Sequence, residues 1–228
     1  MFYELRKYDV MPGRLPALLD RFGSFTVPHW NQRGFRVIGF WTPLMGGNNH
    51  QLVYMLAWES FEERMKKFAD WQASPERAEK WEETERDGPL VHRVNNVLLQ
   101  PTSFSPMDTG VKLDPPTGDH YLFELRDYDT MPGKLRPLVQ RFGGYTTACF
   151  KKHGFHQVGY WTPVMGGHNN RLTYILAWNS LEEREGAFAA FRADPERQRV
   201  FAESEKDGIL VEFVANVLMQ PTGFSPLR

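Results

Sequence analysis

The sequence predicts an α+β protein built from two tandem copies of one domain, each with the element order β-α-β-β-α-β. Two observations predict it. Shifting the chain by 120 positions, so that Glu4 falls on Glu124, superimposes it on itself without a gap, and roughly half of the aligned positions are identical. Within each copy, segments that alternate with period two are separated by segments with apolar residues at helical spacing.

The repeat is carried by four pairs of matching segments. The first two are ELRKYDVMPGRL (4–15) with ELRDYDTMPGKL (124–135), and GFRVIGFWTPLMGGNN (34–49) with GFHQVGYWTPVMGGHN (154–169). The other two are LVYMLAWESFEER (52–64) with LTYILAWNSLEER (172–184), and NVLLQPTSFSP (96–106) with NVLMQPTGFSP (216–226). The segment MDTGVKLDPPTGD (107–119) is rich in Pro, Gly and Asp, as linkers are. We therefore predict domains at 1–106 and 120–228.

The first copy is expected to begin with a strand over residues 2–10, which alternate and contain Tyr, Phe and Leu. A helix can begin at Pro12, where proline costs no hydrogen bond, and is predicted to run to about residue 33. Its apolar stripe contains Leu15, Leu18, Leu19, Phe22 and Trp30. Pro28 should kink this helix, whereas copy two has Ala148 there and should run straighter.

Two further strands are predicted over 35–43 and 51–58, joined by a turn that contains MGGNN. Ser60 with Glu63 forms a capping box at the start of a second helix, and Ser74-Pro75 restarts it. Residues 90–100 form the fourth strand. This is the ferredoxin-like order, in which helices cover one face of a four-stranded antiparallel sheet. The other face must also be covered, so we expect the two sheets to pack into an intramolecular α/β barrel.

Composition argues against several classes of protein. A net charge of −1 provides no field to attract nucleic acid or an anionic membrane. The single cysteine, Cys149, excludes a disulfide framework within the chain and fits a reducing compartment. The chain opens without a secretory pattern and contains no run of about 18 apolar residues, so a cytoplasmic location is expected.

No cofactor is predicted from motifs. Neither GxGxxG nor GxxxxGK[ST] is present, and the histidines form no HxxxH or HExxH set. A metal site is therefore not predicted.

The motifs YELRKYDVMPG, GFWTP with MGG, LAWESFEER and NVLLQPT together resemble the NIPSNAP family across nearly the whole chain. The resemblance implies the dimeric α/β-barrel fold, which single-copy members would build from two chains. It also implies a cavity between a copy's own sheet and its helices. It implies activity only weakly, because barrels of this superfamily include cofactor-free oxygenases, isomerases, lyases and haem enzymes.

Chemistry-bearing residues lie on the first strand. Glu4, Arg6 and Tyr8 share one face by alternation, as do Glu124, Arg126 and Tyr128 in copy two. This set could bind an anionic or hydroxylated substrate and move a proton, with Arg6 as a carboxylate clamp. The alternative is a structural ion pair that avoids the cost of burying a lone charge.

His29 continues the apolar stripe of the first helix and should face the sheet. It is a candidate general base or ligand, or else a core histidine bonded to a nearby acceptor. Copy two has Cys149 at this place, where a buried thiol is expected to pack inertly. The two pockets therefore differ: one is active and the other structural, or they bind different molecules.

The expected walls of the pocket are mostly aromatic, and each residue also has a purely structural interpretation as core or as a partner for the backbone. The candidates for substrate binding are Trp30, Trp41, Tyr54, Trp58, Asn96, Arg126, Tyr128 and Cys149.

We hypothesise a cofactor-independent isomerase, lyase or monooxygenase that acts on an apolar or aromatic small molecule. His29 would be the base, Tyr8 a proton donor or oxyanion partner, and Arg6 the anchor, with Glu4 beside it. The alternative is a non-catalytic ligand-binding or scaffold protein, with haem among its ligands and His29 as axial ligand. The expected partners are a small molecule and a second copy of the chain, with neither nucleic acid nor membrane.

Overall fold

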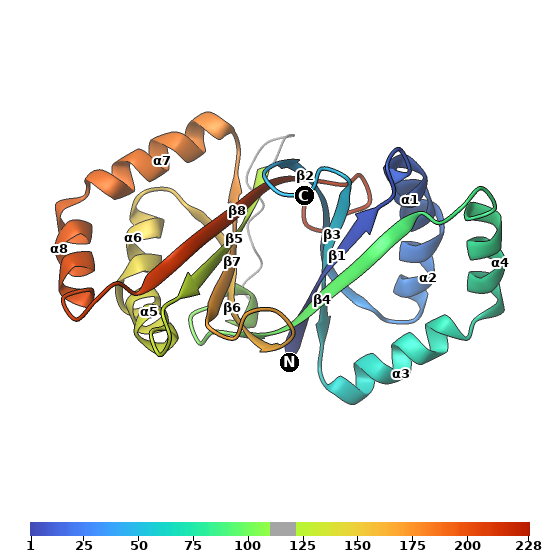
Figure 1. The fold of residues 1–228 in the computed structure, drawn as a ribbon, viewed down its shortest axis with the longest axis horizontal. Helices are drawn as coiled ribbons and strands as arrows, with labels where there is room; N and C mark the ends of the chain where they lie inside the picture. Colours follow the sequence, from blue (N-terminus) through green and yellow to red (C-terminus); the bar gives the residue numbers. More distant parts are fainter. Residues whose placement is uncertain (110–121) are drawn as a thin grey trace. The chain divides into compact units, whose positions relative to one another are not determined.

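The computed structural model describes residues 1–109 and 122–228 (Figure 1). The predicted linker, residues 107–119, lies for the most part outside them. The two copies contain equivalent elements in the same order, which confirms the expected β-α-β-β-α-β arrangement.

The strands of copy one are β1 (Phe2–Val10), β2 (Arg36–Met45), β3 (Gln51–Trp58) and β4 (Val91–Pro101). Those of copy two are β5 (Leu122–Thr130), β6 (His156–Met165), β7 (Arg171–Trp178) and β8 (Val211–Pro221). In copy one, β3 lies between β1 and β2 and is antiparallel to both, and β7 has the same place in copy two. The strand order β1-β3-β2-β8-β5-β7-β6-β4 closes on itself as a barrel, so the predicted fold class is confirmed.

Each unit carries its helices on one side of its strands (Figure 1). Copy one contains α1 (Leu15–Arg21), η1 (Phe22–Thr26), α2 (Val27–Gln32), α3 (Phe61–Gln72) and α4 (Pro75–Thr84). Copy two contains α5 (Leu135–Arg141), η3 (Phe142–Thr146), α6 (Thr147–Lys152), α7 (Leu181–Ala193) and α8 (Pro195–Ser204), and a short turn, η2 (Pro106–Thr109), precedes it. In the described part of the chain, none of the helices is long and apolar enough to cross a membrane.

The first helix of each copy is interrupted by a π-helical turn. The N–H of Val27 donates to the carbonyl of Phe22, five residues back, and Thr147 does the same to Phe142. The interruption is present in copy two, which has Ala148 where copy one has Pro28. The two copies thus have the same secondary structure here, and the stronger kink expected at Pro28 stays a prediction. Pro28 is the second residue of α2, which directly follows the π turn.

The space between the strands and helices of each unit is filled with aromatic side chains. In copy one, Trp30 stacks on Phe35 at 4.9 Å between ring centroids, and Phe40, Tyr54 and Trp58 are fully buried. Rings of this size each bury about 150–250 Å², so a small domain can obtain a stable core from a few of them. The high aromatic share of the sequence is therefore used mainly as core.

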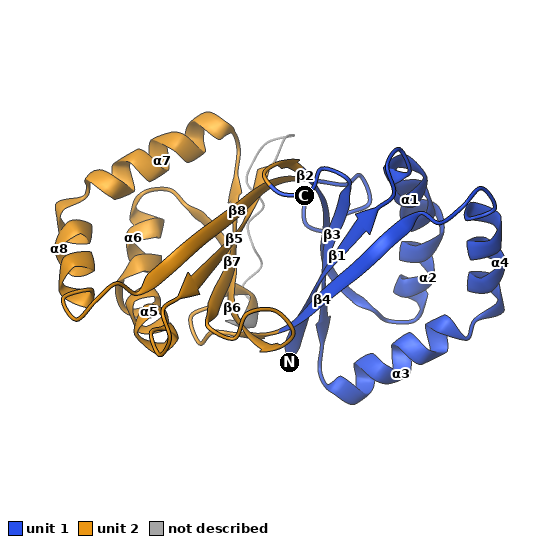
Figure 2. Ribbon diagram, viewed as in Figure 1, with its two compact units in different colours: residues 1–43, 47–98, 221–228 blue, residues 44–46, 99–220 orange. Residues whose placement is uncertain are grey.

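The ends of the two repeats are exchanged between the compact units (Figure 2). One unit comprises residues 1–43, 47–98 and 221–228, and the other comprises residues 44–46 and 99–220. The terminal segment of copy two thus completes the first unit, and the segment that ends copy one completes the second. The repeated NVLxQPTxFSP motif makes the same contacts in both units.

In the first unit, the Oγ of Ser225 accepts a hydrogen bond from the backbone N–H of Phe40 at 2.9 Å. Phe224 beside it covers Gly23 in the π turn, where a Cβ would come within 2.9 Å of its ring. Glycine at this position therefore permits the close approach of the terminal segment.

In the second unit, Ser105 accepts from the N–H of Tyr160 at 3.0 Å. Phe104 covers Gly143, where a Cβ would lie 2.6 Å from its ring. The phenylalanine-on-glycine contact is thus made twice.

We predict that Ser225→Ala and Ser105→Ala each destabilise the protein by about 1–3 kcal/mol, because each leaves a buried backbone N–H without an acceptor. Urea unfolding followed by circular dichroism measures the change. Ser24→Ala is the control, since Ser24 is exposed and should change the free energy of unfolding by less than about 0.5 kcal/mol. Equal effects of the three substitutions would contradict the prediction.

Candidate functional site

A buried ionic network lies on the first strand of each copy. In copy one its centre is Glu4, whose side chain is fully buried. Oε1 of Glu4 accepts from Arg6 Nη1 at 2.6 Å, Arg64 Nη2 at 2.7 Å and Asn96 Nδ2 at 3.1 Å. Its Oε2 accepts from Arg64 Nε at 2.9 Å and Trp58 Nε1 at 3.1 Å. Five donors saturate a group that has about four acceptor sites.

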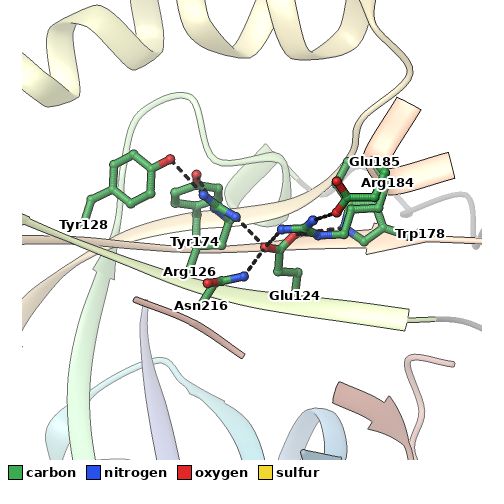
Figure 3. A network of polar contacts seen from close by, with 8 residues as sticks. All are labelled: Glu124, Arg126, Tyr128, Tyr174, Trp178, Arg184, Glu185 and Asn216. Carbon is green, nitrogen blue, oxygen red and sulfur yellow. Dashed lines mark hydrogen bonds and ion pairs between the residues drawn. The ribbon is translucent and has the colours of Figure 1, made fainter. Parts of the chain in front are cut away.

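Copy two repeats this network (Figure 3). Glu124 accepts from Arg126, from both Nε and Nη2 of Arg184 at 2.9 and 2.7 Å, from Asn216 at 2.9 Å and from Trp178 at 3.2 Å. The same five donors at equivalent positions show that the arrangement belongs to the repeat itself.

The charges of the network stabilise one another. Burial alone would raise the pKa of Glu4, but the hydrogen bond from Arg64 and the positive charges of Arg6 and Arg64 hold that pKa below its ordinary value. Burial by itself would lower the pKa of Arg6. The interactions with Tyr54, Tyr8 and Glu4 outweigh burial and raise that pKa above its ordinary value. Burial also raises the pKa of Tyr54 well above normal. At neutral pH, Glu4 and Arg6 are therefore charged and Tyr54 is neutral.

Glu4 also orients Arg6. The guanidinium of Arg6 donates from Nε to the Tyr54 hydroxyl at 2.8 Å and from Nη2 to the Tyr8 hydroxyl at 3.4 Å. It lies 5.0 Å from the centroid of the Phe68 ring. With one side bonded to Glu4 and another face on an aromatic ring, Arg6 has a fixed direction.

A cavity of about 60 Å³ lies beside this oriented Arg6 in copy one. Its lining residues come from β1, η1, α2, α3 and α4, and they are Arg6, Tyr8, Phe22, Thr26, Trp30, Phe68, Trp71, Gln72, Arg77 and Trp81. None of these described residues is acidic. The lining residues therefore carry two guanidinium groups, a phenol, a hydroxyl, three indole N–H groups and an amide.

Three of these polar groups are buried without a hydrogen-bond partner in the described structure. They are Oγ1 of Thr26, Nε1 of Trp30 and Nε of Arg77. An unpaired buried polar group costs about 1–3 kcal/mol, and all three of these groups belong to residues of the cavity wall. Thr26 is the last residue of the π turn, a feature frequent at functional sites.

The structure brings together most of the predicted copy-one residues. Arg6, Tyr8 and Trp30 line the cavity. The Tyr54 hydroxyl accepts a hydrogen bond from Arg6, while Trp58 and Asn96 donate hydrogen bonds to Glu4. Arg126 and Tyr128 occupy the equivalent places in copy two, where the Nη2 of Arg126 donates to the Tyr128 hydroxyl at 3.1 Å.

His29 lies apart from this set. Its Nδ1 is 2.8 Å from the carbonyl oxygen of Phe25, and its ring packs 4.0 Å from the Phe25 ring and 6.1 Å from that of Trp71. Because a carbonyl only accepts, Nδ1 is the donor in this hydrogen bond, which leaves Nε2 as the nitrogen that could act as a base. His29 is not among the residues that line the cavity. Its role as a base stays a prediction.

Trp41 and Cys149 also lie away from the cavity. Trp41 covers Gly39, where a Cβ would overlap its indole ring, and alternation along β2 puts it on the face opposite Phe40. Cys149 is buried in copy two, with its sulfur 4.0 Å from Oδ2 of Asp194.

The sequence pattern did not predict Arg64 as a partner of Glu4, nor most of the helical wall of the cavity: Thr26, Trp71, Gln72, Arg77 and Trp81. A signal for Arg64 was present, because the segment that contains it recurs with Arg184 at the matching position. The helical wall had no such signal, since it is assembled from four separate helical segments.

Comparison with known proteins identifies one family. The NIPSNAP family model matches residues 3–106 and 123–226. The human protein NipSnap homolog 3B is 23% identical over 233 residues, which cover all of this chain and 86% of the relative.

Two solved structures have a similar fold. A candidate monooxygenase from Lactobacillus acidophilus aligns with a TM-score of 0.58 at 11% identity, covering 96% of this chain and 93% of its own. An anthrone oxidase-like protein aligns with a TM-score of 0.58 at 13% identity, and the alignment covers 97% of this chain and 91% of that protein. At these identities the likeness shows the fold.

We predict that Glu4→Gln lowers the free energy of unfolding at pH 7 by about 3–5 kcal/mol, because it leaves two arginines buried beside a neutral amide. Asp70→Asn, which removes an exposed pair with Lys66, is the control and should cost less than about 1 kcal/mol. Urea unfolding measures both. A cost for Glu4→Gln no larger than that of the control would contradict the prediction.

The network also predicts a dependence of stability on pH. Folding lowers the pKa of Glu4 and of Glu124 below 4.5. The contribution of these two carboxylates to the free energy of unfolding is therefore complete above about pH 4.5. It is lost as the pH falls through their pKa values in the folded protein. The free energy of unfolding should decline below pH 4.5, and less steeply in the double variant Glu4→Gln/Glu124→Gln. Identical slopes in the two proteins would count against ionised glutamates.

Proposed function

Since this chain belongs to the NIPSNAP family, in which fold alone does not define an activity, we propose a function from its site. Copy one binds a small molecule through an oxygen that carries or develops negative charge, and acts on it as a cofactor-independent enzyme. The observation that supports this proposal is a cavity lined with hydrogen-bond donors and two arginines, in which none of the described lining residues is acidic.

The direction of Arg6 supports a role in stabilising negative charge. Donors aimed in advance at a developing charge are effective because they need not reorganise during the reaction. Arg6 is fixed by Glu4 and Tyr54, and Tyr8 lies 3.4 Å from its Nη2. We assign Arg6 as the anchor for the oxygen and Tyr8 as a proton donor to it.

The reaction class follows from the charge that this site would stabilise. Isomerisation, elimination and oxygenation of an activated carbon can each pass through an enolate, whose negative charge lies on oxygen. The names of the two solved proteins of similar fold, a candidate monooxygenase and an anthrone oxidase-like protein, are compatible with this class. His29 remains the proposed base, with Nε2 as its free nitrogen.

The size of the cavity limits the substrate. Pockets for drug-sized ligands usually measure about 300–1,000 Å³, whereas this one measures about 60 Å³. It admits a group of a few heavy atoms. A larger aromatic substrate would insert only its oxygen-bearing end, or would displace Gln72 and Arg77, of which Gln72 is exposed and Arg77 half-buried.

A second candidate function is binding without catalysis. It is favoured by the saturation of Glu4, whose five donors leave it no free lone pair to accept a proton from a substrate. Of the predicted acid–base residues, only Tyr8 then lines the cavity. Binding and turnover must therefore be measured separately.

The two copies differ in the lining of this region. Positions 30, 71 and 81 are tryptophans in copy one, whereas the matching positions 150, 191 and 201 are phenylalanines, and Gln72 is matched by Arg192. Copy two thus lacks the indole N–H groups. We assign the proposed activity to copy one.

We predict that acetate binds to copy one at least about tenfold more tightly than acetamide, its neutral analogue, because charge-assisted hydrogen bonds are about twice as strong as neutral ones. Tryptophan fluorescence reports the binding, since three tryptophans line the cavity. Arg77→Met and Thr26→Val should weaken acetate binding, whereas Arg197→Met, at the matching place in copy two, should not. Equal binding of the two ligands would contradict an anion site.

Catalysis is tested with pyruvate, which carries both a carboxylate and an enolisable methyl group. We expect the protein to accelerate exchange of the methyl protons in heavy water, measured by proton NMR, and Tyr8→Phe to slow it by about 10²-fold or more. His29→Ala tests the proposed base in the same assay. Pyruvate binding without accelerated exchange would favour the non-catalytic function, and failure to bind would exclude pyruvate as a ligand.

A further inference from the structure

We propose that copy two contains a binding site for a transition-metal ion such as Zn²⁺ or Co²⁺, formed by Cys149, His153 and Asp194. This site is separate from the cavity of copy one and does not depend on the function proposed for it. Cys149 lies on α6, His153 is the residue that directly follows the end of α6, and Asp194 is the N-cap of α8.

The positions of the three side chains suit a shared ion. Cys149 and His153 are four residues apart, so their side chains lie one above the other on the same face of a helical turn. His153 Nε2 is 2.8 Å from Oδ2 of Asp194, and the Cys149 sulfur is 4.0 Å from the same oxygen. One potential ligand atom from each residue lies within 4.8 Å of the others.

A tetrahedral zinc ion requires only modest shifts of the ligand atoms. Zn–S bonds of about 2.3 Å and Zn–N and Zn–O bonds of about 2.0–2.2 Å put neighbouring ligand atoms roughly 3.5 Å apart. The widest pair in the cluster, which lies within 4.8 Å, must therefore close by about 1 Å, and His153 Nε2 and Asp194 Oδ2, 2.8 Å apart, must separate by roughly 0.5 Å. Side-chain rotation can supply both shifts. Three protein ligands would leave the fourth position to water or a small ligand.

Asp194 is held in the orientation that a ligand needs. Its Oδ1 accepts from the N–H groups of Glu196 and Arg197 at 2.9 and 3.2 Å, so its Oδ2 is turned toward the other two ligands. Hydrogen bonds that orient a ligand in this way are typical of protein metal sites.

Burial and charge are compatible with an ion that enters from solvent. Cys149 and Asp194 are buried, whereas His153 is half-buried. The Nζ of Lys152 lies 2.7 Å from Oδ2 of Asp194, the oxygen that would bind the ion. The side chain of Lys152 is 66% exposed. A divalent ion can therefore replace Lys152, which turns outward into water. With a thiolate and a carboxylate, the set neutralises the charge of a divalent ion.

Copy one shows that this fold does not need the cluster. The positions that match Cys149, His153 and Asp194 are His29, Arg33 and Ser74. Ser74 is the N-cap of α4, as Asp194 is of α8, so the helix start is maintained without a carboxylate. The Cys-His-Asp set is therefore a specific feature of copy two. The absence of HxxxH and HExxH spacing predicted no metal site, and Asp194, 45 residues from Cys149, has no place in such a motif.

The test is a titration of the reduced, metal-free, full-length protein with Co²⁺. A cobalt ion bound to a thiolate gives sulfur-to-metal charge-transfer absorption in the near ultraviolet, and the chain has only one cysteine. We expect this absorption to saturate at one Co²⁺ per chain and to disappear when Zn²⁺ is added. Zn²⁺ should also slow the reaction of Cys149 with a thiol reagent by at least about tenfold.

Three variants should remove the site. Cys149→Ser abolishes the charge-transfer absorption, and His153→Arg and Asp194→Ser, which introduce the residues of copy one, weaken Co²⁺ binding at least about tenfold. His168→Asn, at an exposed histidine, is the matched control and should leave binding unchanged. Circular dichroism verifies that each variant is folded.

The absence of charge-transfer absorption at equimolar Co²⁺ would overturn the proposal, as would unchanged Co²⁺ affinity in folded Cys149→Ser. The wild-type protein provides a test that depends on no variant. A thiol that reacts equally fast with and without Zn²⁺ would also overturn it.

Discussion

The buried carboxylate on the first strand is the constraint on which the rest of each unit depends. An ionised glutamate in a core is costly unless donors surround it, and Glu4 and Glu124 each have five. Apart from the arginine two residues along the same strand, those donors come from strands and a helix that are distant in sequence. One carboxylate therefore fixes α3 or α7 over the sheet and orients the neighbouring arginine at the same time.

The exchange of chain ends makes the two repeats interdependent. Each compact unit contains a Phe-Ser pair from the other repeat, with the serine bonded to a strand N–H and the phenylalanine packed on a glycine of the π turn. Contacts at these glycines leave no room for a Cβ, which explains why both repeats have glycine there. The π turn also provides the threonine at the cavity, so the chain end and the candidate site meet at one short segment of helix.

The two copies have the same framework but different chemistry around it. The Glu-Arg-Tyr set and its Arg and Asn partners are identical, because they support folding in both. Divergence is concentrated on the helices: tryptophans become phenylalanines in one region, and His29, Arg33 and Ser74 are matched by Cys149, His153 and Asp194 in another. A duplicated framework with separate helical surfaces can support two different binding sites in one chain.

The sequence alone determined the duplication, the element order and the shared face of Glu4, Arg6 and Tyr8, because these follow from a gapless repeat and from local periodicity. Only the tertiary structure decided that Glu4 is saturated, that His29 bonds to the Phe25 carbonyl, and that Thr26 and Arg77 join the cavity wall. The physical reason is that local pattern specifies which face a side chain takes. The partners of a side chain come from distant segments, as Arg64 does for Glu4 and Asp194 for Cys149. No local pattern predicts those contacts.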